Sequence, residues 1–394
     1  MSRPVRSRTV ARIAAGVSAV LVTTVLATVS TTGAVAGSTP QGTRDGAGLT
    51  RALERLVAMP GGPPGAVAVV HRGHHRTVYT AGVANVTTQR HIRVSDHMRI
   101  ASIAKAFSGA VALTLVDRGR LSLRDTIGER LPYLPDAWGN VTLGQMLQHT
   151  SGLPDYTKNK KFLERATAHP LVPLPPRQLL AFVKSKPLVF TPGSRYEYSN
   201  SDNIAVALMV EAVTGRPYAR VMHRLVSKPL DLVRTSLPTG ARLPRPFIHG
   251  YAVEPGQPLE DLSEVLAAGL TFASGGVVST PADLDRFIRG YAGARLFGRD
   301  VQAKQLRLVD GESDPPGPGV NSAGLGIFRY ETRCGTVYGH TGNFPGYTQF
   351  AASTLDGHRS VTLSVSRQLR PDVDPVVFGA LRRADVRAVC AALR

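Results

Sequence analysis

Ser102-Ile103-Ala104-Lys105 is the stretch that decides both the fold and the chemistry of this chain. A serine hydroxyl is a weak nucleophile unless a base lies beside it, and a lysine three residues later shares its face of a helix. Lysine is scarce, with eight residues among 394, so its occurrence at this spacing is informative. Ser-x-x-Lys alone also arises by chance, and the pair would then be a helix cap and a surface lysine.

An apolar run with helical periodicity extends over residues 101–118 and ends at Gly119. We therefore expect Ser102 at or near a helix N-terminus, where free backbone N–H groups and the helix dipole favour negative charge. A lysine held among buried polar groups can have a lowered pKa and exchange a proton. These features make Ser102 the candidate nucleophile and Lys105 its proton-exchanging partner.

Tyr198-Ser199-Asn200 is a second candidate segment, and we expect it in a loop just before a helix. A phenol beside a cationic lysine can act as a phenolate, so Tyr198 is interpreted as the general base, with Lys105 lowering its pKa. An amide side chain both donates and accepts, so Asn200 could orient Lys105 and a substrate carbonyl. The ordinary alternatives are a buried tyrosine and a helix-capping asparagine.

His340-Thr341-Gly342 is the third segment, expected at the end of a strand and followed by Asn343. We expect His340 to supply positive charge or a hydrogen bond beside Tyr198, and the Thr341 hydroxyl to bind a substrate carboxylate. Gly342 would let a substrate approach the strand edge as a further strand. The backbone N–H groups of Ser102 and Asn343 are the candidates for an oxyanion hole. A buried core histidine is the ordinary alternative, and the joint occurrence of three segments favours a serine acyl-transfer site.

The N-terminal 36 residues have the pattern of a secretory signal peptide. Four arginines precede an apolar run over residues 13–29, and Ala34-Val35-Ala36 provides an A-x-A cleavage site. A membrane anchor is the alternative, but the run is shorter than the roughly 20 residues that span a bilayer. We expect a secreted protein with a flexible leader over residues 37–48 and one catalytic unit over residues 49–394.

The chain is strongly basic, with a formal charge of +19 that falls to +15 without the four arginines of the signal. Such an excess attracts anionic partners, of which a cell envelope is the leading candidate outside a membrane. The arginines are scattered and no nucleic-acid-binding motif is present, so no nucleic-acid partner is expected. No metal, no cofactor and a monomeric state are expected.

Cys334 and Cys390 are the only two cysteines, and an even number in a secreted chain favours a disulfide. Two buried thiols are the alternative. The remaining patterns run in the order β/α, mostly α, then β/α. The helical part covers about residues 120–268, and two strands flanking Asp356-Gly357 indicate a late hairpin.

With these residues considered, the chain resembles the class C β-lactamase-like serine hydrolases, and most of all their secreted D-alanyl-D-alanine carboxypeptidases. The likeness covers about residues 49–393. Besides the three segments, it rests on the following stretches: Gln148-His149-Thr150-Ser151-Gly152-Leu153, Ser274-Gly275-Gly276 and Tyr338-Gly339-His340. The resemblance implies an α/β fold with an antiparallel sheet flanked by helices, an inserted helical domain, and a cleft between the two.

The resemblance also implies the reaction. Ser102 would attack a D-Ala-D-Ala bond of a peptidoglycan stem peptide and release D-alanine from an acyl-enzyme, and β-lactam antibiotics would acylate the same serine. Histidine at 340, where such β-lactamases carry lysine, favours the peptidase. A β-lactamase, an esterase and a D-amino-acid peptidase or amidase remain alternatives, as does a β-lactam-binding sensor.

One departure bears on the substrate. The resembling carboxypeptidases place a carboxylate-binding arginine soon after a Gly-Leu-Gly. Here Gly324-Leu325-Gly326 is followed by Ile327 and Phe328, and Arg329 comes one position later. Arg329 is thus the candidate for the substrate carboxylate.

Overall fold

The computed structural model describes residues 41–394 except residue 255. The predicted signal peptide and residues 37–40 lie outside the described residues. Within the part of the chain that the structure describes, every helix is too short or too polar to cross a lipid bilayer.

The centre of the fold is an eight-stranded sheet in which every neighbouring pair is antiparallel. The order across the sheet is β2 (His75–Gly82), β1 (Gly65–Arg72), β12 (Arg359–Val365), β11 (Tyr347–Ser353), β10 (Gly335–Phe344), β9 (Phe328–Thr332), β8 (Val320–Ala323) and β7 (Val309–Asp310). The first and last strands of the described residues, β1 and β12, are therefore neighbours, next to the edge strand β2. The predicted hairpin on either side of Asp356-Gly357 is confirmed as β11–β12.

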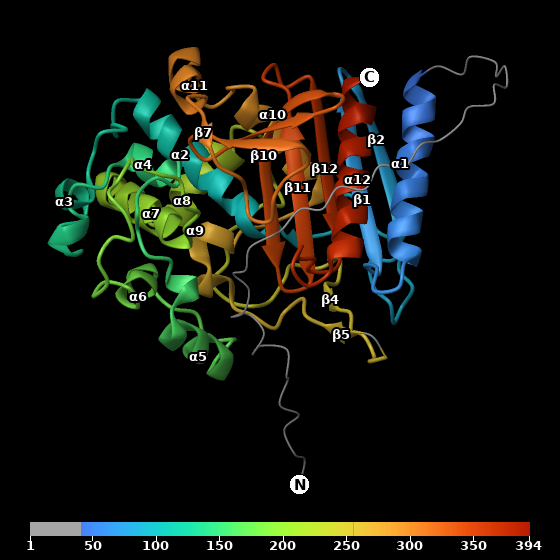
Figure 1. Ribbon diagram of the computed structural model, residues 1–394, viewed down its shortest axis with the longest axis horizontal. Coiled ribbons are helices and arrows are strands. Elements are labelled where there is room, and N and C mark those ends of the chain that lie inside the picture. The colour runs from blue at the N-terminus through green and yellow to red at the C-terminus, as the bar shows by residue number, and fades with distance from the viewer. Residues whose placement is uncertain (1–40, 255) are drawn as a thin grey trace, which may run out of the picture.

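Helices α1 (Gln41–Ala58) and α12 (Pro375–Leu393) lie side by side on one face of the sheet (Figure 1). Leu49 and Leu53 of α1 and Leu381 of α12 pack with Phe350 of β11 in one apolar cluster. Helix α10 (Pro281–Ala292) covers the opposite face, and its Phe287 belongs to a second, larger cluster. The sheet thus lies between two apolar layers.

Residues 41–48 form the first turns of α1, so the prediction of a flexible leader over residues 37–48 is wrong for this part. The prediction rested on glycine content, but here the glycines allow close packing. Gly46 and Gly48 are buried, and a Cβ on Gly46 would lie 2.8 Å from the Tyr79 hydroxyl oxygen of β2. Leu49, completely buried in α1, then holds the helix to the sheet.

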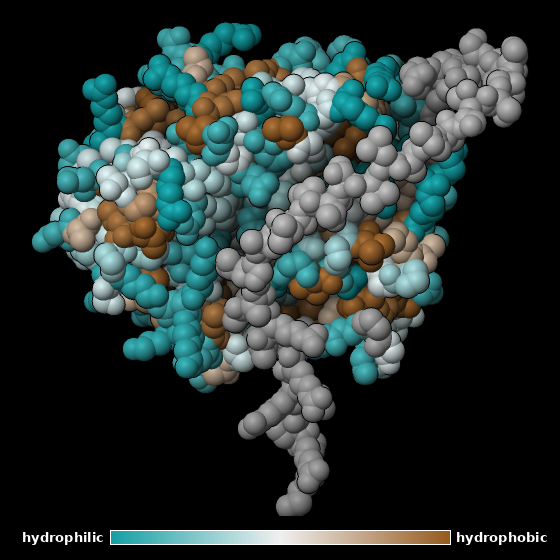
Figure 2. Space-filling model, viewed as in Figure 1, coloured by the Kyte–Doolittle hydropathy of each residue, from teal (hydrophilic) through white to brown (hydrophobic). Residues whose placement is uncertain are grey.

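The remaining helices form a separate group beside the sheet, drawn mainly in green in Figure 1. They are α2 (Ala104–Asp117), α3 (Ile127–Arg130), α4 (Leu143–Leu147), α5 (Lys160–Ala168), α6 (Pro176–Ala181), α7 (Asn200–Thr214), α8 (Tyr218–Met222), α9 (Phe272–Gly275) and α11 (Arg299–Gln305). Short two-stranded pairs join β3 (Met98–Arg99) to β6 (Val278–Ser279) and β4 (Tyr251–Ala252) to β5 (Glu260–Asp261). Much of the visible surface is hydrophilic (Figure 2), because the large apolar side chains fill the two clusters.

Helix α2 lies at the centre of the helical group. All of its residues from Ala104 to Leu115 are buried, as expected for a helix that is apolar on every side. It contacts α7, α8 and α9. The lysine in its first turn is therefore surrounded by protein rather than by water, and this placement determines the chemistry of the site.

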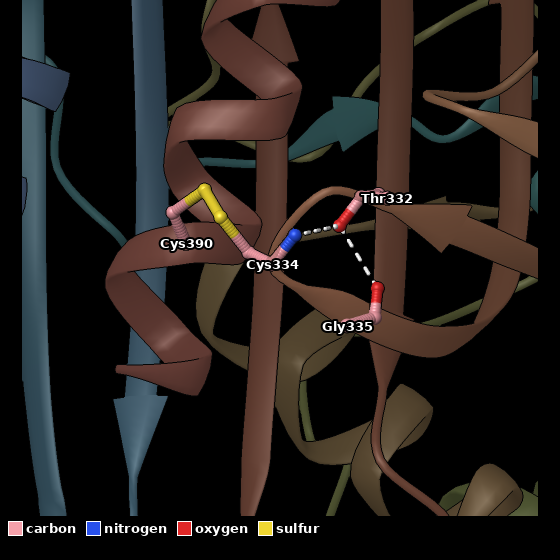
Figure 3. The surroundings of a disulfide bond; sticks show 4 residues. All are labelled: Thr332, Cys334, Gly335 and Cys390. Atoms are coloured by element: carbon pink, nitrogen blue, oxygen red, sulfur yellow. Dashed lines mark hydrogen bonds between the residues drawn. A yellow bond between two sulfur atoms is a disulfide. The ribbon is translucent and has the colours of Figure 1, made fainter.

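Cys334 and Cys390 form a disulfide, which confirms the pairing predicted from the even number of cysteines (Figure 3). Cys334 lies in the turn between β9 and β10, where its N–H donates to the Thr332 hydroxyl at 3.2 Å, and Cys390 lies near the end of α12. The bond joins the outer helix to the beginning of β10. His340 lies farther along the same strand, away from the disulfide.

Replacing both cysteines by serine is expected to lower the free energy of unfolding by about 4 kcal/mol, because the bond closes a loop with a sequence separation of 56 residues. The kcat should be unchanged at temperatures where the variant stays folded. Denaturant unfolding and initial rates at 25 °C measure the two quantities. A folded double variant with strongly reduced kcat would contradict a purely structural role.

Candidate active site

The backbone around the candidate nucleophile is held in an unusual conformation. Ser102 lies in the short 3₁₀ helix η2 (Ala101–Ile103), directly before α2, as the sequence predicted. Ala101 has φ of +51°, a left-handed conformation that costs a non-glycine residue roughly 1–3 kcal/mol. The N–H of Ile100 donates to Val277 O at 3.3 Å and holds this turn against β6. The strained residue thus immediately precedes the serine.

Strand β10 passes close to this turn. A Cβ on Gly342 would lie 2.6 Å from Ile100 O and 3.0 Å from the backbone nitrogen of Ser102. Gly342 thus makes room for the nucleophile's own backbone, and its role toward a substrate stays a prediction. Pairing of β9 with β10 ends at Gly339, so His340 to Phe344 keep one strand edge free of β9. This part of β10 lies next to Ser102.

Lys105 is completely surrounded by protein, and its amine contacts three oxygen atoms. Lys105 Nζ lies 3.1 Å from Ser102 Oγ, 2.8 Å from Asn200 Oδ1 and 2.8 Å from Ser274 O. Desolvation lowers the pKa of Lys105 to about 7, although nearby carboxylates oppose that effect. The two carbonyl oxygens can only accept, so they hold two N–H bonds and leave the third position directed at the serine.

Asn200 is the first residue of α7, and all polar atoms of its side chain have partners. Its oxygen accepts from Lys105, while its Nδ2 donates to Asp155 Oδ2 at 2.9 Å and to Thr157 Oγ1 at 3.1 Å. The structure thus supports an orienting contact with Lys105. It does not support the predicted contact with a substrate carbonyl, because both N–H groups are already used.

Tyr198 lies against Lys105, with the lysine Nζ 4.8 Å from the centre of the phenol ring. Its hydroxyl oxygen is buried and has no hydrogen-bond partner of good geometry among the described residues. Desolvation raises the pKa of Tyr198 well above its usual value, and the neighbouring Ser102 hydroxyl only partly opposes this rise. This direction favours a neutral phenol in the resting protein over the predicted lysine-stabilised phenolate.

His149 also packs against the phenol ring of Tyr198, at 4.5 Å between ring centres. Its Nδ1 lies 2.8 Å from Asp202 Oδ2, and Ser151 Oγ donates to the other carboxyl oxygen at 2.5 Å. Burial lowers the pKa of His149 to about 3 and raises that of Asp202 well above its usual value. Both directions favour uncharged forms, so this cluster positions Tyr198 without adding charge.

His340 lies in β10 with no exposed surface, and its ring centre is 6.4 Å from that of Tyr198. Desolvation lowers the pKa of His340 to about 3, and the charge on Lys105 adds to the effect. Of the two predicted roles, this lowered pKa favours the hydrogen bond over the positive charge. Nδ1 donates to Thr341 O at 2.6 Å, which leaves Nε2 as a buried acceptor without a partner among the described residues.

The Thr341 hydroxyl is also buried and donates to Pro315 O at 2.6 Å. Side chains alternate between the faces of a strand, and Thr341 pairs with Phe350, whose side chain belongs to the cluster under α1 and α12. The predicted contact between this hydroxyl and a substrate carboxylate is therefore wrong. Thr341 instead holds the loop that contains Pro315.

Asn343 and Arg329 also differ from their expected roles as side chains. The Asn343 amide donates to Leu369 O at 2.8 Å and accepts from Thr348 Oγ1, so only its backbone remains a candidate for the oxyanion hole. Arg329 Nη2 contacts Glu331 Oε1 and Ser322 Oγ, both at 3.2 Å. Arg329 is not among the charged groups that shift the pKa of Lys105, Tyr198 or His340.

Three contributors to the site were missed as functional residues. The Asp155 carboxylate accepts hydrogen bonds from the backbone N–H and from the side-chain amide of Asn200. The Ser274 carbonyl binds Lys105, and the His149–Asp202 pair supports Tyr198. Ser274 and His149 lie in stretches that had already been singled out, and this was a usable signal. Asp155 stands in no pattern that would distinguish it from a surface carboxylate.

An antiparallel sheet beside a helical group, with Ser-x-x-Lys at a helix N-terminus and a tyrosine and strand β10 around it, defines the class of penicillin-recognising serine hydrolases. A model of the family described as Beta-lactamase matches residues 49–384, and the chain belongs to this family.

Similar proteins include both peptidases and amidases. The chain is 24% identical to a penicillin-binding protein of Bacillus subtilis over 74% of this chain and 65% of that protein. It is 26% identical to the D-alanyl-D-alanine-carboxypeptidase/endopeptidase AmpH of Escherichia coli over 63% of this chain and 62% of AmpH. The chain thus spans less than two thirds of the length of these curated relatives. A D-stereospecific amidohydrolase from Streptomyces sp. has a similar structure, with 31% identity, a TM-score of 0.71, and coverage of 82% of this chain and 94% of that one.

Proposed function

We propose that the protein is a serine amidohydrolase that cleaves amide bonds of D-amino-acid derivatives through an acyl-enzyme on Ser102. The observation that carries the proposal is the contact of 3.1 Å between Lys105 Nζ and Ser102 Oγ, with the amine held by two carbonyl oxygens. D-stereospecificity is supported by the similarity to the Streptomyces amidohydrolase, which covers most of both chains.

In the first half-reaction, neutral Lys105 accepts the proton of Ser102 while Oγ forms a bond to the substrate carbonyl carbon. A group with a pKa near 7 is well suited to this step at neutral pH. The developing oxyanion would accept hydrogen bonds from the backbone N–H groups of Ser102 and Asn343. The site thus contains a base that is already adjacent to the nucleophile.

The leaving nitrogen needs a proton before the C–N bond breaks. The neutral Tyr198 hydroxyl, unpartnered and beside Ser102, is the group placed to donate it. The proton held by Lys105 then replaces the one that Tyr198 has given. In the second half-reaction, water attacks the acyl-enzyme and gives a proton to the Lys105–Tyr198 pair. The pair returns a proton to Ser102 Oγ as the ester bond breaks.

A D-alanyl-D-alanine carboxypeptidase is the second candidate, and similarity to AmpH favours it. Such a substrate ends in a carboxylate, which needs a cationic or hydroxyl partner near the serine. The two groups expected to fill this role are Arg329 and Thr341, and both have other partners. We therefore rank this candidate below the amidase.

A substrate panel tests the proposal. Purified protein should hydrolyse D-alanine p-nitroanilide with a kcat/KM at least about tenfold above that for the L enantiomer, a transition-state difference of about 1.4 kcal/mol. It should act more slowly on an acetylated peptide ending in D-Ala-D-Ala and on nitrocefin, and Ser102→Ala provides the background. Faster release of D-alanine from the peptide would replace the amidase by the carboxypeptidase, and rapid nitrocefin turnover would replace it by a β-lactamase.

A further inference from the structure

The loop over residues 311–319 is fastened beside the nucleophile on both sides of Asp314. Before Asp314, the Tyr196 hydroxyl donates to Glu312 O at 2.6 Å, and the Tyr330 hydroxyl donates to Ser313 Oγ at 3.0 Å. After it, Pro315 O accepts from Thr341, the neighbour of His340. Two of these anchors, Tyr196 and Thr341, come from the segments that supply Tyr198 and His340, and the third, Tyr330, belongs to β9. The position of Asp314 relative to the site is therefore fixed by the fold.

The Asp314 side chain is exposed and, within the described part of the chain, makes no hydrogen bond or ion pair. Its charge nevertheless acts on Lys105 and on Tyr198. Desolvation also raises the pKa of Asp314, although part of its side chain is exposed. The loop anchors fix this carboxylate beside the site, and it lacks a counter-ion in contact among the described residues.

The cations near this carboxylate have other partners. Lys158 and Arg370 act on Asp314 only through their fields, while Lys158 lies 3.8 Å from Glu197 and Arg370 lies 2.7 Å from Asp372. Lys105 itself is buried, and its amine is hydrogen-bonded to Ser102, Asn200 and Ser274. A substrate carboxylate entering here would meet a like charge. A substrate ammonium would find a carboxylate without a counter-ion, and a charge-assisted hydrogen bond between the two is stronger than one between neutral groups.

We propose that Asp314 binds the free α-ammonium group of the substrate, so that the enzyme selects D-aminoacyl amides or peptides with an unblocked amino terminus. This inference rests on the proposed function and names its substrate class. Asp155 and Asp202, the other acids whose charges act on Lys105, do not compete for the role. Asp155 accepts from Asn200 and Thr157, and Asp202 contacts His149 and accepts from Ser151.

The test compares D-alanine p-nitroanilide with its N-acetyl derivative on the wild-type protein and on Asp314→Asn. The wild type should prefer the free amine. Asp314→Asn should lose about 10- to 100-fold in kcat/KM for the free amine, mainly through KM, the size expected for one charge-assisted hydrogen bond. Hydrolysis of the acetylated substrate should change little. Glu312→Gln, which removes an exposed acid two positions away, is the matched control and should behave as wild type.

Several results would overturn the inference. An equal loss on both substrates would show that Asp314 acts only through Lys105, and no loss on either would remove it from the site. Asp314→Glu keeps the charge and should retain much of the preference, so a folding defect in Asp314→Asn does not leave the question open. Wild-type protein that cleaves both amides equally well would refute the ammonium role and leave the proposed function intact. If it cleaves neither amide while fluorescent penicillin labels Ser102, the proposed function itself fails, and the inference fails with it.

Discussion

Replacing Ser102 by alanine is expected to abolish covalent labelling by fluorescent penicillin and to lower kcat for D-alanine p-nitroanilide by about four orders of magnitude or more. The substitution removes only the hydroxyl group, and Lys105 Nζ keeps its contacts with Asn200 and Ser274. The thermal midpoint should therefore stay close to that of the wild type. Labelling followed by gel fluorescence, with thermal unfolding in parallel, measures both effects.

Ser199→Ala is a matched control for this variant. Ser199 lies in the same site, its hydroxyl is buried, and that hydroxyl has no hydrogen-bond partner among the described residues. Labelling should persist in Ser199→Ala. Persistent labelling in Ser102→Ala would instead move the nucleophile to another residue, and the proposed reaction would have to be abandoned.

The rate should depend on pH through Lys105. If its neutral amine is the base, kcat/KM should fall about tenfold for each pH unit below a pKa near 7 and level off above it. The direction follows because the protonated form, which predominates below the pKa, cannot accept the serine proton. A pH series of initial rates, with an uncharged N-acetyl substrate to keep the substrate's own titration out of the profile, measures this pKa.

Lys105→Met should remove this limb of the profile and lower kcat/KM by about 10²- to 10⁴-fold, the range typical of a lost general base. The apolar chain of methionine fits a buried position without a charge, although Asn200 Oδ1 and Ser274 O lose their donor. A variant that keeps both near-normal rates and the limb near pH 7 would assign the base to another group.

The main elements and the site motifs were predictable because each depends on local pattern. The α2 helix followed from helical periodicity, the β11–β12 hairpin from its turn residues and the disulfide from the even number of cysteines, and the structure contains all three. The contact of Ser102 with Lys105 followed from their spacing on a helix. The start of α1 was missed because glycine content suggests flexibility, whereas packing against Tyr79 makes use of it.

The charges and the available hydrogen bonds of the site could not be inferred in the same way. The sequence contained the phenol, the imidazole and the threonine, but their states depend on how much water and which partners the fold leaves them. Burial keeps Tyr198 and His340 neutral, and strand alternation turns Thr341 toward Pro315. Arg329 is paired with Glu331 for the same kind of reason, since side chains two residues apart share one face of a strand.

By itself, then, the sequence identified the candidate nucleophile, its lysine and the class of enzyme, because a helical spacing and a set of short motifs carry that information locally. Only the tertiary structure decided which groups burial favours in the uncharged form and which charges lie near the site. Desolvation and electrostatic interaction act between segments as distant as Lys105, Asn200 and Asp314, and their magnitudes exist only once folding has brought those segments together.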